Sequence, residues 1–322
     1  MNQKQITALE EAISGDYSNI AGMVALQEGN PLYENYFNAC TATTAIHVFS
    51  VTKSVISILI GIAIDKGYIK SIDQKVLEFF PDYKIKRGEK TIQAVTMKHM
   101  LTMTAPYKYK SAPYTKYFTS DDWVTSALDL LGGKKPIGEF RYTPLIGPDI
   151  LSGILANTTG QSVLDFAREH LFLPLGITVA SNINFKDKEE QFAFLKAKNI
   201  SGWVADPKGI HTAGWGLTMT ALDMAKIGKL CLDNGTWNGK QIVSEQWIEE
   251  STKEQSRWTE LNLAYGYLWW PNIGNGYAAM GDSGNVIYIN PAKKLVVSIA
   301  SLYKPTAKDR IELIMKYVEP CV

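Results

Sequence analysis

One apolar run constrains the fold of this chain more than any other segment. Residues 47–67 read HVFSVTKSVISILIGIAIDKG, and most side chains from Val51 to Ile64 are aliphatic. A helix that is apolar around most of its circumference is typical of a buried core element. The longest apolar stretch of the run, Val55 to Ile64, is shorter than the ~20 residues that a membrane span needs, and Gly67 follows as a natural left-handed helix end. The sequence therefore predicts a buried helix over residues 50–66.

Ser50 and Lys53 stand three residues apart on this helix, so their side chains share one face. No other ionisable residue lies between Lys53 and Asp65 to hold the lysine charge. An exposed lysine titrates near ~10.4, but burial lowers the pKa of an amine by several units. A neutral Lys53 would be a base, and a serine becomes a nucleophile when a neighbouring base takes its proton. The pair is a candidate catalytic site.

The same spacing also fits a purely structural interpretation. Ser50 would then cap the helix through its hydroxyl, and Lys53 would extend its ammonium to solvent. The spacing recurs at Ser301 and Lys304, where Pro305 disfavours a helix at the lysine. We interpret this second copy as incidental. The choice between the two interpretations of Ser50 depends on the rest of the chain.

Strand patterns lie at both ends of the chain, and helix patterns lie between them. Residues 21–38 predict two strands around a Gly-Asn-Pro turn, and residues 265–301 contain several strand-like segments with Gly, Asn and Pro breaks. We expect an α/β (α+β) fold with an antiparallel sheet flanked by helices. The sheet domain would comprise residues 1–75 and 205–322, and residues 76–204 would form an inserted, mostly helical domain.

Composition argues against several classes of partner. The chain has 33 Lys and Arg against 32 Asp and Glu, with no polybasic run, which argues against nucleic acid or an anionic membrane surface. The four histidines form no His-x-x-x-His pair, and no glycine-rich phosphate loop precedes a helix, so neither a metal nor another cofactor is predicted. The three cysteines lack a CxxC spacing, and the polar N-terminus has no signal core. We expect a cytoplasmic protein without a membrane span.

Several blocks of the sequence resemble one known family. The segment FSVTKSVISILIGIAIDKGYI, residues 49–69, is similar to the active-site helix of the serine β-lactamase and penicillin-binding protein superfamily, particularly its class C-like esterases and amide hydrolases. Residues 95–104, 138–177 and 209–252 are similar to further blocks of that family, in the same order. The resemblance implies a β-lactamase/transpeptidase-like fold. It also implies a serine hydrolase that cleaves a small ester, amide or short peptide through an acyl-enzyme.

The resemblance also implies roles for particular residues. Ser50 would be the acylated nucleophile, and Lys53 would accept its proton or tune it. Tyr142, in the segment FRYT, would carry the proton between the serine and the leaving group. Tyr107 and Tyr114, in an aromatic-rich loop, are alternatives for this tyrosine.

The segment GDSGN, residues 281–285, matches a variant of the third family motif. The resemblance implies that the backbone N–H groups of Ser50 and Asp282 form the oxyanion hole. The expected substrate-binding residues are Gly281, Ser283, His211 and Trp215.

Two departures from the family pattern argue against efficient β-lactamase activity. Pro144 stands where the second motif usually has Asn or Ser, and a proline side chain forms no hydrogen bond. No Lys-Thr-Gly motif occurs in the C-terminal strands. These departures leave two alternatives open. One is a catalytically silent, penicillin-binding-like ligand binder, and the other is a D-amino-acid peptidase or carboxypeptidase.

Overall fold

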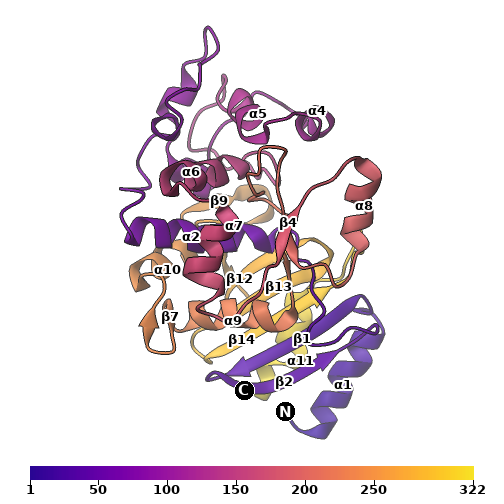
Figure 1. The fold of residues 1–322 in the computed structure, drawn as a ribbon. Helices are drawn as coiled ribbons and strands as arrows, with labels where there is room; N and C mark the ends of the chain where they lie inside the picture. The colour runs from indigo at the N-terminus through magenta and orange to yellow at the C-terminus, as the bar shows by residue number, and fades with distance from the viewer.

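A computed structural model describes residues 1–322, and its central element is a six-stranded antiparallel sheet (Figure 1). In spatial order the strands are β11 (Trp270–Ile273), β12 (Gly276–Gly281), β13 (Asn285–Asn290), β14 (Leu295–Ser301), β1 (Ile20–Gln27) and β2 (Asn30–Tyr36). The two ends of the chain meet in the middle of the sheet, where Val24 of β1 pairs with Ser298 of β14. The predicted antiparallel sheet from both chain ends is confirmed.

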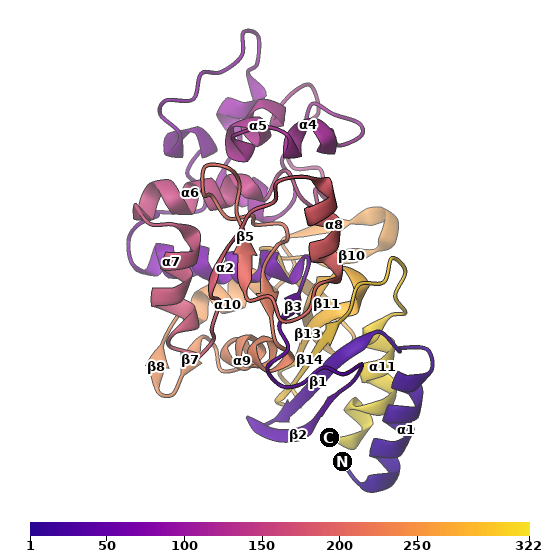
Figure 2. The same ribbon diagram turned by 45° about the vertical axis from the view of Figure 1, so that its right-hand side comes forward.

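Helices cover both faces of this sheet. The helix α9 (Ala221–Leu232) packs on β13 and β14, and Gly228 allows it to approach the side chain of Ile287 closely. On the next residue of the strand, the Tyr288 hydroxyl lies 3.9 Å from the sulfur of Met315 in α11 (Arg310–Tyr317). Successive strand residues point to opposite faces, so α9 and α11 lie on opposite sides of the sheet. Figure 2 shows α11 beside α1 (Gln3–Ser14), near both termini.

The middle of the chain forms a mostly helical region above the sheet (Figure 1). Its helices are α3 (Met97–Leu101), α4 (Tyr114–Phe118), α5 (Trp123–Leu130), α6 (Asp149–Thr159), α7 (Val163–Ala167) and α8 (Lys188–Lys196). None of the six strands of the large sheet lies within residues 76–204. The domain boundaries near residues 75 and 205 stay predictions.

The predicted buried helix is α2 (Val51–Asp65), which lies between the sheet and the helical region. Every residue from Val51 to Ala63 is buried, and Gly67 takes the left-handed conformation, with φ +77°, just beyond the helix. It packs on both β12 and α6, which explains why apolar residues surround it. No helix in the structure is long and apolar enough to cross a bilayer.

A short strand pair precedes the helix α9. The helix begins at Ala221, after Thr220 caps it. The preceding residues form the short strand β6 (Thr218–Met219), which pairs with β3 (Ile46–His47). The pairing partner lies far away in sequence, so a local pattern could not reveal it.

Candidate active site

The side chains of Ser50 and Lys53 meet at the start of α2. The amine nitrogen Nζ of Lys53 donates hydrogen bonds to the hydroxyl oxygen Oγ of Ser50 over 2.7 Å and to the carbonyl oxygen of Gly214 over 2.8 Å. The Ser50 hydroxyl donates to the same carbonyl over 3.3 Å. One backbone carbonyl thus holds the hydroxyl and the amine side by side, in the adjacency that their spacing predicted.

The purely structural interpretation of this pair does not fit the structure. Ser50 makes no side-chain capping bond to the helix, and Lys53 is only 2% exposed, so its amine does not extend to solvent. Burial lowers the pKa of Lys53 to about 7, and the charges of Asp282 and Asp149 act in the opposite direction. A sizeable fraction of Lys53 is therefore uncharged near neutral pH, as a proton acceptor must be.

Tyr142 lies against the same pair. The Nζ atom of Lys53 is 5.5 Å from the centroid of the Tyr142 ring. Burial raises the pKa of Tyr142 to about 12, and a hydrogen bond with Ser50 acts against this rise. The phenol therefore keeps its proton at neutral pH, and it is a hydrogen-bond donor next to the serine.

The two alternative tyrosines point elsewhere. The hydroxyl of Tyr107 lies 3.9 Å from the sulfur of Met100 in a buried position. Tyr114, on α4, stacks on Phe118 with 6.2 Å between the ring centroids. Of the three tyrosines that the sequence left open, the structure brings Tyr142 to Ser50.

The turn between β12 and β13 approaches the start of α2 closely. A Cβ atom on Gly281 would lie 2.4 Å from the carbonyl oxygen of Val48 and 3.0 Å from the backbone nitrogen of Ser50, so only glycine permits this approach. The next residue, Asp282, lines a pocket together with Ser50. An oxyanion hole built from the N–H groups of Ser50 and Asp282 needs the two backbones in this kind of proximity.

The same turn is held in place by its own hydrogen bonds. Ser283 has a left-handed φ of 64°, and its hydroxyl accepts from the Lys304 N–H over 3.0 Å and donates to the Lys304 carbonyl over 3.2 Å. The side chain of Asn19 donates to the Ser283 carbonyl over 2.8 Å. The Ser283 hydroxyl is thus already paired with backbone. It positions the turn, although the residue also lines the pocket.

The pocket beside Ser50 has a volume of about 370 Å³ and a largely apolar wall. That wall is formed by Phe49, Phe118, Leu145, Leu195, Trp215 and Tyr303. Trp215 therefore lies where the sequence predicted a substrate-binding residue. Apolar pockets with a few convergent polar groups are typical of small-molecule sites.

His211 lies outside this pocket. Its ring is fully buried, its Nε2 atom is 2.9 Å from the side-chain oxygen of Asn182, and it packs against Trp203. The structure therefore gives His211 no contact with a substrate in the pocket, contrary to the sequence-based expectation. His47 lines the pocket instead, but burial lowers its pKa to about 3 and its Nε2 accepts the Gly216 N–H over 2.9 Å, so it is neutral.

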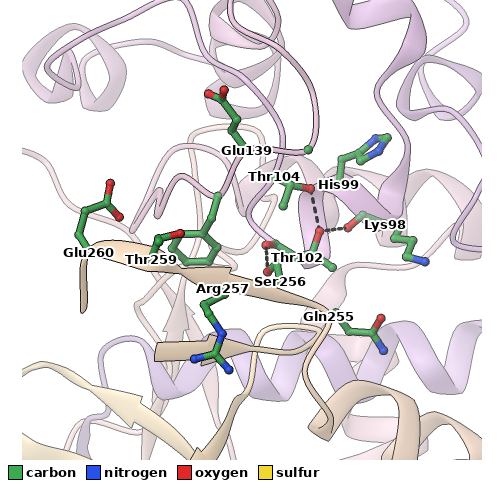
Figure 3. A pocket seen from close by; sticks show the side chains of 12 residues that line it. Lys98, His99, Thr102, Thr104, Glu139, Gln255, Ser256, Arg257, Thr259 and Glu260 are labelled. Carbon is green, nitrogen blue, oxygen red and sulfur yellow. Dashed lines mark hydrogen bonds between the residues drawn. The ribbon is translucent and has the colours of Figure 1, made fainter. Parts of the chain in front are cut away.

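A larger and more polar cavity of about 630 Å³ lies elsewhere, between α3 and residues 255–260 (Figure 3). Its hydroxyl groups pair with their neighbours. Thr102 donates to the Lys98 carbonyl over 2.8 Å, and Ser256 donates to the Thr102 carbonyl over 2.7 Å. Since neither Ser50, Lys53 nor Tyr142 lines this cavity, it is not the candidate active site.

Two residues of the site escaped the sequence analysis. Gly214 contributes only a carbonyl, and no side-chain pattern marks a backbone group. Asp149 is 2% exposed and accepts the Ala213 N–H over 2.7 Å, directly before Gly214. A carboxylate at the start of the apolar segment DILSGIL was a signal that could have indicated it.

The chain is similar to known proteins over most of its length. The profile of the β-lactamase family matches residues 8–319. The 6-aminohexanoate-dimer hydrolase of Paenarthrobacter ureafaciens is 23% identical over 305 residues, which cover 87% of this chain and 72% of that relative.

Two solved structures have a similar fold. A penicillin-binding protein homologue from Caulobacter crescentus aligns with a TM-score of 0.76 at 17% identity, covering 99% of this chain and 97% of the other. A family VIII carboxylesterase aligns with a TM-score of 0.74 at 14% identity, covering 99% and 98% of the two chains. The family match over nearly the whole length shows that the chain belongs to the β-lactamase family.

Proposed function

We propose that this protein hydrolyses an ester or amide bond in a small molecule through an acyl-enzyme on Ser50. The observation that carries the proposal is the 2.7 Å contact between the Ser50 hydroxyl and a lysine amine that is 2% exposed. The relatives named as a 6-aminohexanoate-dimer hydrolase and as a family VIII carboxylesterase support hydrolysis.

The reaction would begin with the attack of Ser50 Oγ on the substrate carbonyl carbon. The hydroxyl proton passes to the neutral Nζ of Lys53, and the negative charge on the carbonyl oxygen is stabilised by the N–H groups of Ser50 and Asp282. Tyr142 donates its phenolic proton to the leaving group as the carbonyl–leaving-group bond breaks, and it regains a proton from Lys53. A water molecule then attacks the acyl-enzyme, and the same proton transfers run in reverse.

The carbonyl of Gly214 supports an active enzyme, although Pro144 stands where the second family motif usually has Asn or Ser. Pro144 removes the side chain that would hydrogen bond to the lysine in the usual motif. The Gly214 carbonyl accepts a bond from Lys53 over 2.8 Å in its place. This contact disfavours the catalytically silent binder, because the amine is already held against the serine.

The direct test is covalent labelling of the wild-type protein. Incubation with a fluorophosphonate is expected to add one phosphonyl group, and peptide mass spectrometry should locate it on Ser50. A control esterase labelled under the same conditions shows that the reagent is active. Absence of any adduct on this chain would contradict the proposed function.

The activity should depend on pH through Lys53. Because burial lowers the pKa of Lys53 to about 7, we expect kcat/KM to rise with pH, with a midpoint near 7. No basic limb is expected below pH 9, because the pKa of Tyr142 is raised to about 12. Hydrolysis of a p-nitrophenyl ester between pH 5 and 9 measures this profile. A rate that is flat down to pH 5 would contradict the role of Lys53.

The apolar pocket should select the acyl group of the substrate. Each methylene that becomes buried contributes about 0.8 kcal/mol, so kcat/KM is expected to rise about fourfold per methylene until the pocket is full. Leu195→Trp, on α8, would fill part of the pocket. We expect it to lower kcat/KM for a hexanoyl ester about tenfold and to leave an acetyl ester within about twofold.

A neighbouring position on the same helix provides the control. Phe192 is 65% exposed and does not line the pocket. Phe192→Trp should therefore leave the chain-length profile unchanged. If Leu195→Trp and Phe192→Trp gave the same chain-length profile, the acyl group would bind outside this pocket.

A further inference from the structure

We propose that Asp149 is a positioning residue of this active site. In this proposal Asp149 orients the Gly214 carbonyl toward Lys53 and Ser50, and its buried charge stabilises the ammonium that Lys53 becomes when Ser50 loses its proton. The inference depends on the proposed function, since it concerns how the same catalytic pair is set up.

The geometry connects Asp149 to the catalytic pair in two steps. One carboxylate oxygen accepts the Ala213 N–H over 2.7 Å, and the neighbouring Gly214 N–H lowers the pKa of the carboxyl group. The carbonyl of Gly214 then accepts from Lys53 over 2.8 Å and from Ser50 over 3.3 Å. The carboxylate thus holds the backbone directly before the Gly214 carbonyl, and this carbonyl in turn holds the amine and the hydroxyl together.

The surrounding packing leaves this peptide little freedom to move. A Cβ on Gly214 would lie 2.4 Å from the carbonyl oxygen of Pro144, so the peptide is pressed against the segment that carries Tyr142. The other oxygen of Asp149 accepts the hydroxyl of Tyr117, on α4, over 2.7 Å. With both of its oxygens paired, the carboxylate has one orientation, and it transmits that orientation to Gly214.

The charge of Asp149 also acts on Lys53 through the protein interior. It raises the pKa of Lys53, as does the charge of Asp282, against the larger effect of burial. Interactions between charges are strong where water is excluded. A negative charge near Lys53 therefore favours the state in which Lys53 has just accepted the serine proton.

The ionisable groups around both residues determine what a pH experiment will report. Burial raises the pKa of Asp149 to about 7, the hydrogen bonds from Tyr117 and from the backbone lower it, and Asp206 raises it. Tyr107 also senses the charge of Asp149, but burial raises the pKa of this phenol far beyond neutral pH. Tyr142 and Asp282 face Lys53, as described above. Asp149 and Lys53 are thus the pair that titrates near neutrality.

The test is the pH profile of kcat/KM for a p-nitrophenyl ester, measured for the wild type and for Asp149→Asn. Asparagine keeps the shape and one acceptor oxygen but carries no charge. We expect kcat to fall about tenfold to a hundredfold, with KM changing less than about threefold. The acidic limb should shift to lower pH by about one unit, because Lys53 loses a neighbouring negative charge.

A second readout separates this inference from the proposed function. The rate at which a fluorophosphonate labels Ser50 reports the state of Lys53 without any turnover. Wild-type labelling must succeed for the proposed function to stand. If wild-type labelling succeeds, the pH dependence of the labelling rate tests Asp149 separately. A midpoint for Asp149→Asn equal to that of the wild type would overturn the role of Asp149 but not the proposed function. A merely structural residue would alter stability and leave the midpoint unchanged.

Asp206 supplies a matched control. It is also buried and accepts backbone N–H groups from Trp123, Lys208 and Ile210, but it does not contact the peptide of Gly214. We expect Asp206→Asn to lower thermal stability. Since loss of the Asp206 charge favours ionised Asp149, the midpoint should not move to lower pH. A shift as large as that of Asp149→Asn would overturn the proposal, since any buried carboxylate would then have the same effect.

If Asp149→Asn does not fold, Tyr117→Phe provides the test. This change removes the hydroxyl that stabilises the ionised carboxylate, so more Asp149 is protonated at neutral pH. We expect kcat to fall a fewfold and the acidic limb of the pH profile to move to lower pH, as for Asp149→Asn. An unchanged profile in folded Tyr117→Phe protein would overturn the inference.

Discussion

Replacing Ser50 by alanine is expected to lower kcat/KM for an activated ester by about 10⁴-fold or more, because the acyl-enzyme can no longer form. Stability should change little, since the Ser50 hydroxyl makes no capping bond to the helix and its partners belong to the catalytic group and to the Gly214 carbonyl. Ester hydrolysis and thermal melting measure the two effects.

Another serine of the same helix is a suitable control. The hydroxyl of Ser57 is buried and has no hydrogen-bond partner. Ser57→Ala should therefore retain wild-type activity without loss of stability. Activity of Ser50→Ala within about tenfold of the wild type would show that another nucleophile carries the reaction.

Replacing Lys53 by methionine is expected to separate activity from stability. The change removes the base, so kcat/KM should fall by about 10³-fold or more, and adding Ser50→Ala should cost little further because the two groups act as a unit. Methionine fills a similar volume without a charge. The variant should therefore be more stable than the wild type at pH 6, with a gain on the order of 2 kcal/mol in the free energy of unfolding.

The sign of this stability change follows from the pKa. Burial lowers the pKa of Lys53 from 10.5 to about 7 in the folded protein. The folded state therefore holds a costly buried ammonium below pH 7, and this cost is relieved as pH rises from about 7 to 10.5. The advantage of Lys53→Met should be largest at pH 6 and should shrink at pH 9. Denaturant unfolding at both pH values measures it, and a variant less stable than the wild type at pH 6 would contradict the assignment.

Much of the fold could be predicted from local pattern. The aliphatic residues around α2 indicated a helix buried on all sides, and residues 51–63 are indeed buried. The segments NVIYIN and LVVSIAS are continuous apolar runs, and both became fully buried central strands. The order of the strands in the sheet was harder to predict, because neighbouring strands such as β1 and β14 lie at opposite ends of the chain. Here the strand patterns at both ends of the chain, rather than any signal of pairing, supported a sheet built from both ends.

The candidate active site was also predictable from the sequence only in part. The spacing of Ser50 and Lys53 is a property of one helix, so the sequence sufficed to predict their adjacency. The tyrosine could not be chosen in this manner. Tyr107 and Tyr142 lie in irregular segments and Tyr114 begins the short helix α4, and the positions of all three depend on distant contacts. His211 shows the opposite failure. It stands in a family block near the cleft, yet its ring is buried outside the pocket and contacts Asn182.

The sequence alone determined that a lysine would be buried next to a serine, because helix periodicity and the surrounding aliphatic residues are local properties. Only the tertiary structure decided what holds that lysine: the carbonyl of Gly214, oriented by the carboxylate of Asp149, from segments far apart in the chain. Backbone carbonyls carry no sequence signature. Their direction is determined by the packing of the whole fold, and so the acceptor that replaces the missing side chain at Pro144 became visible only in three dimensions.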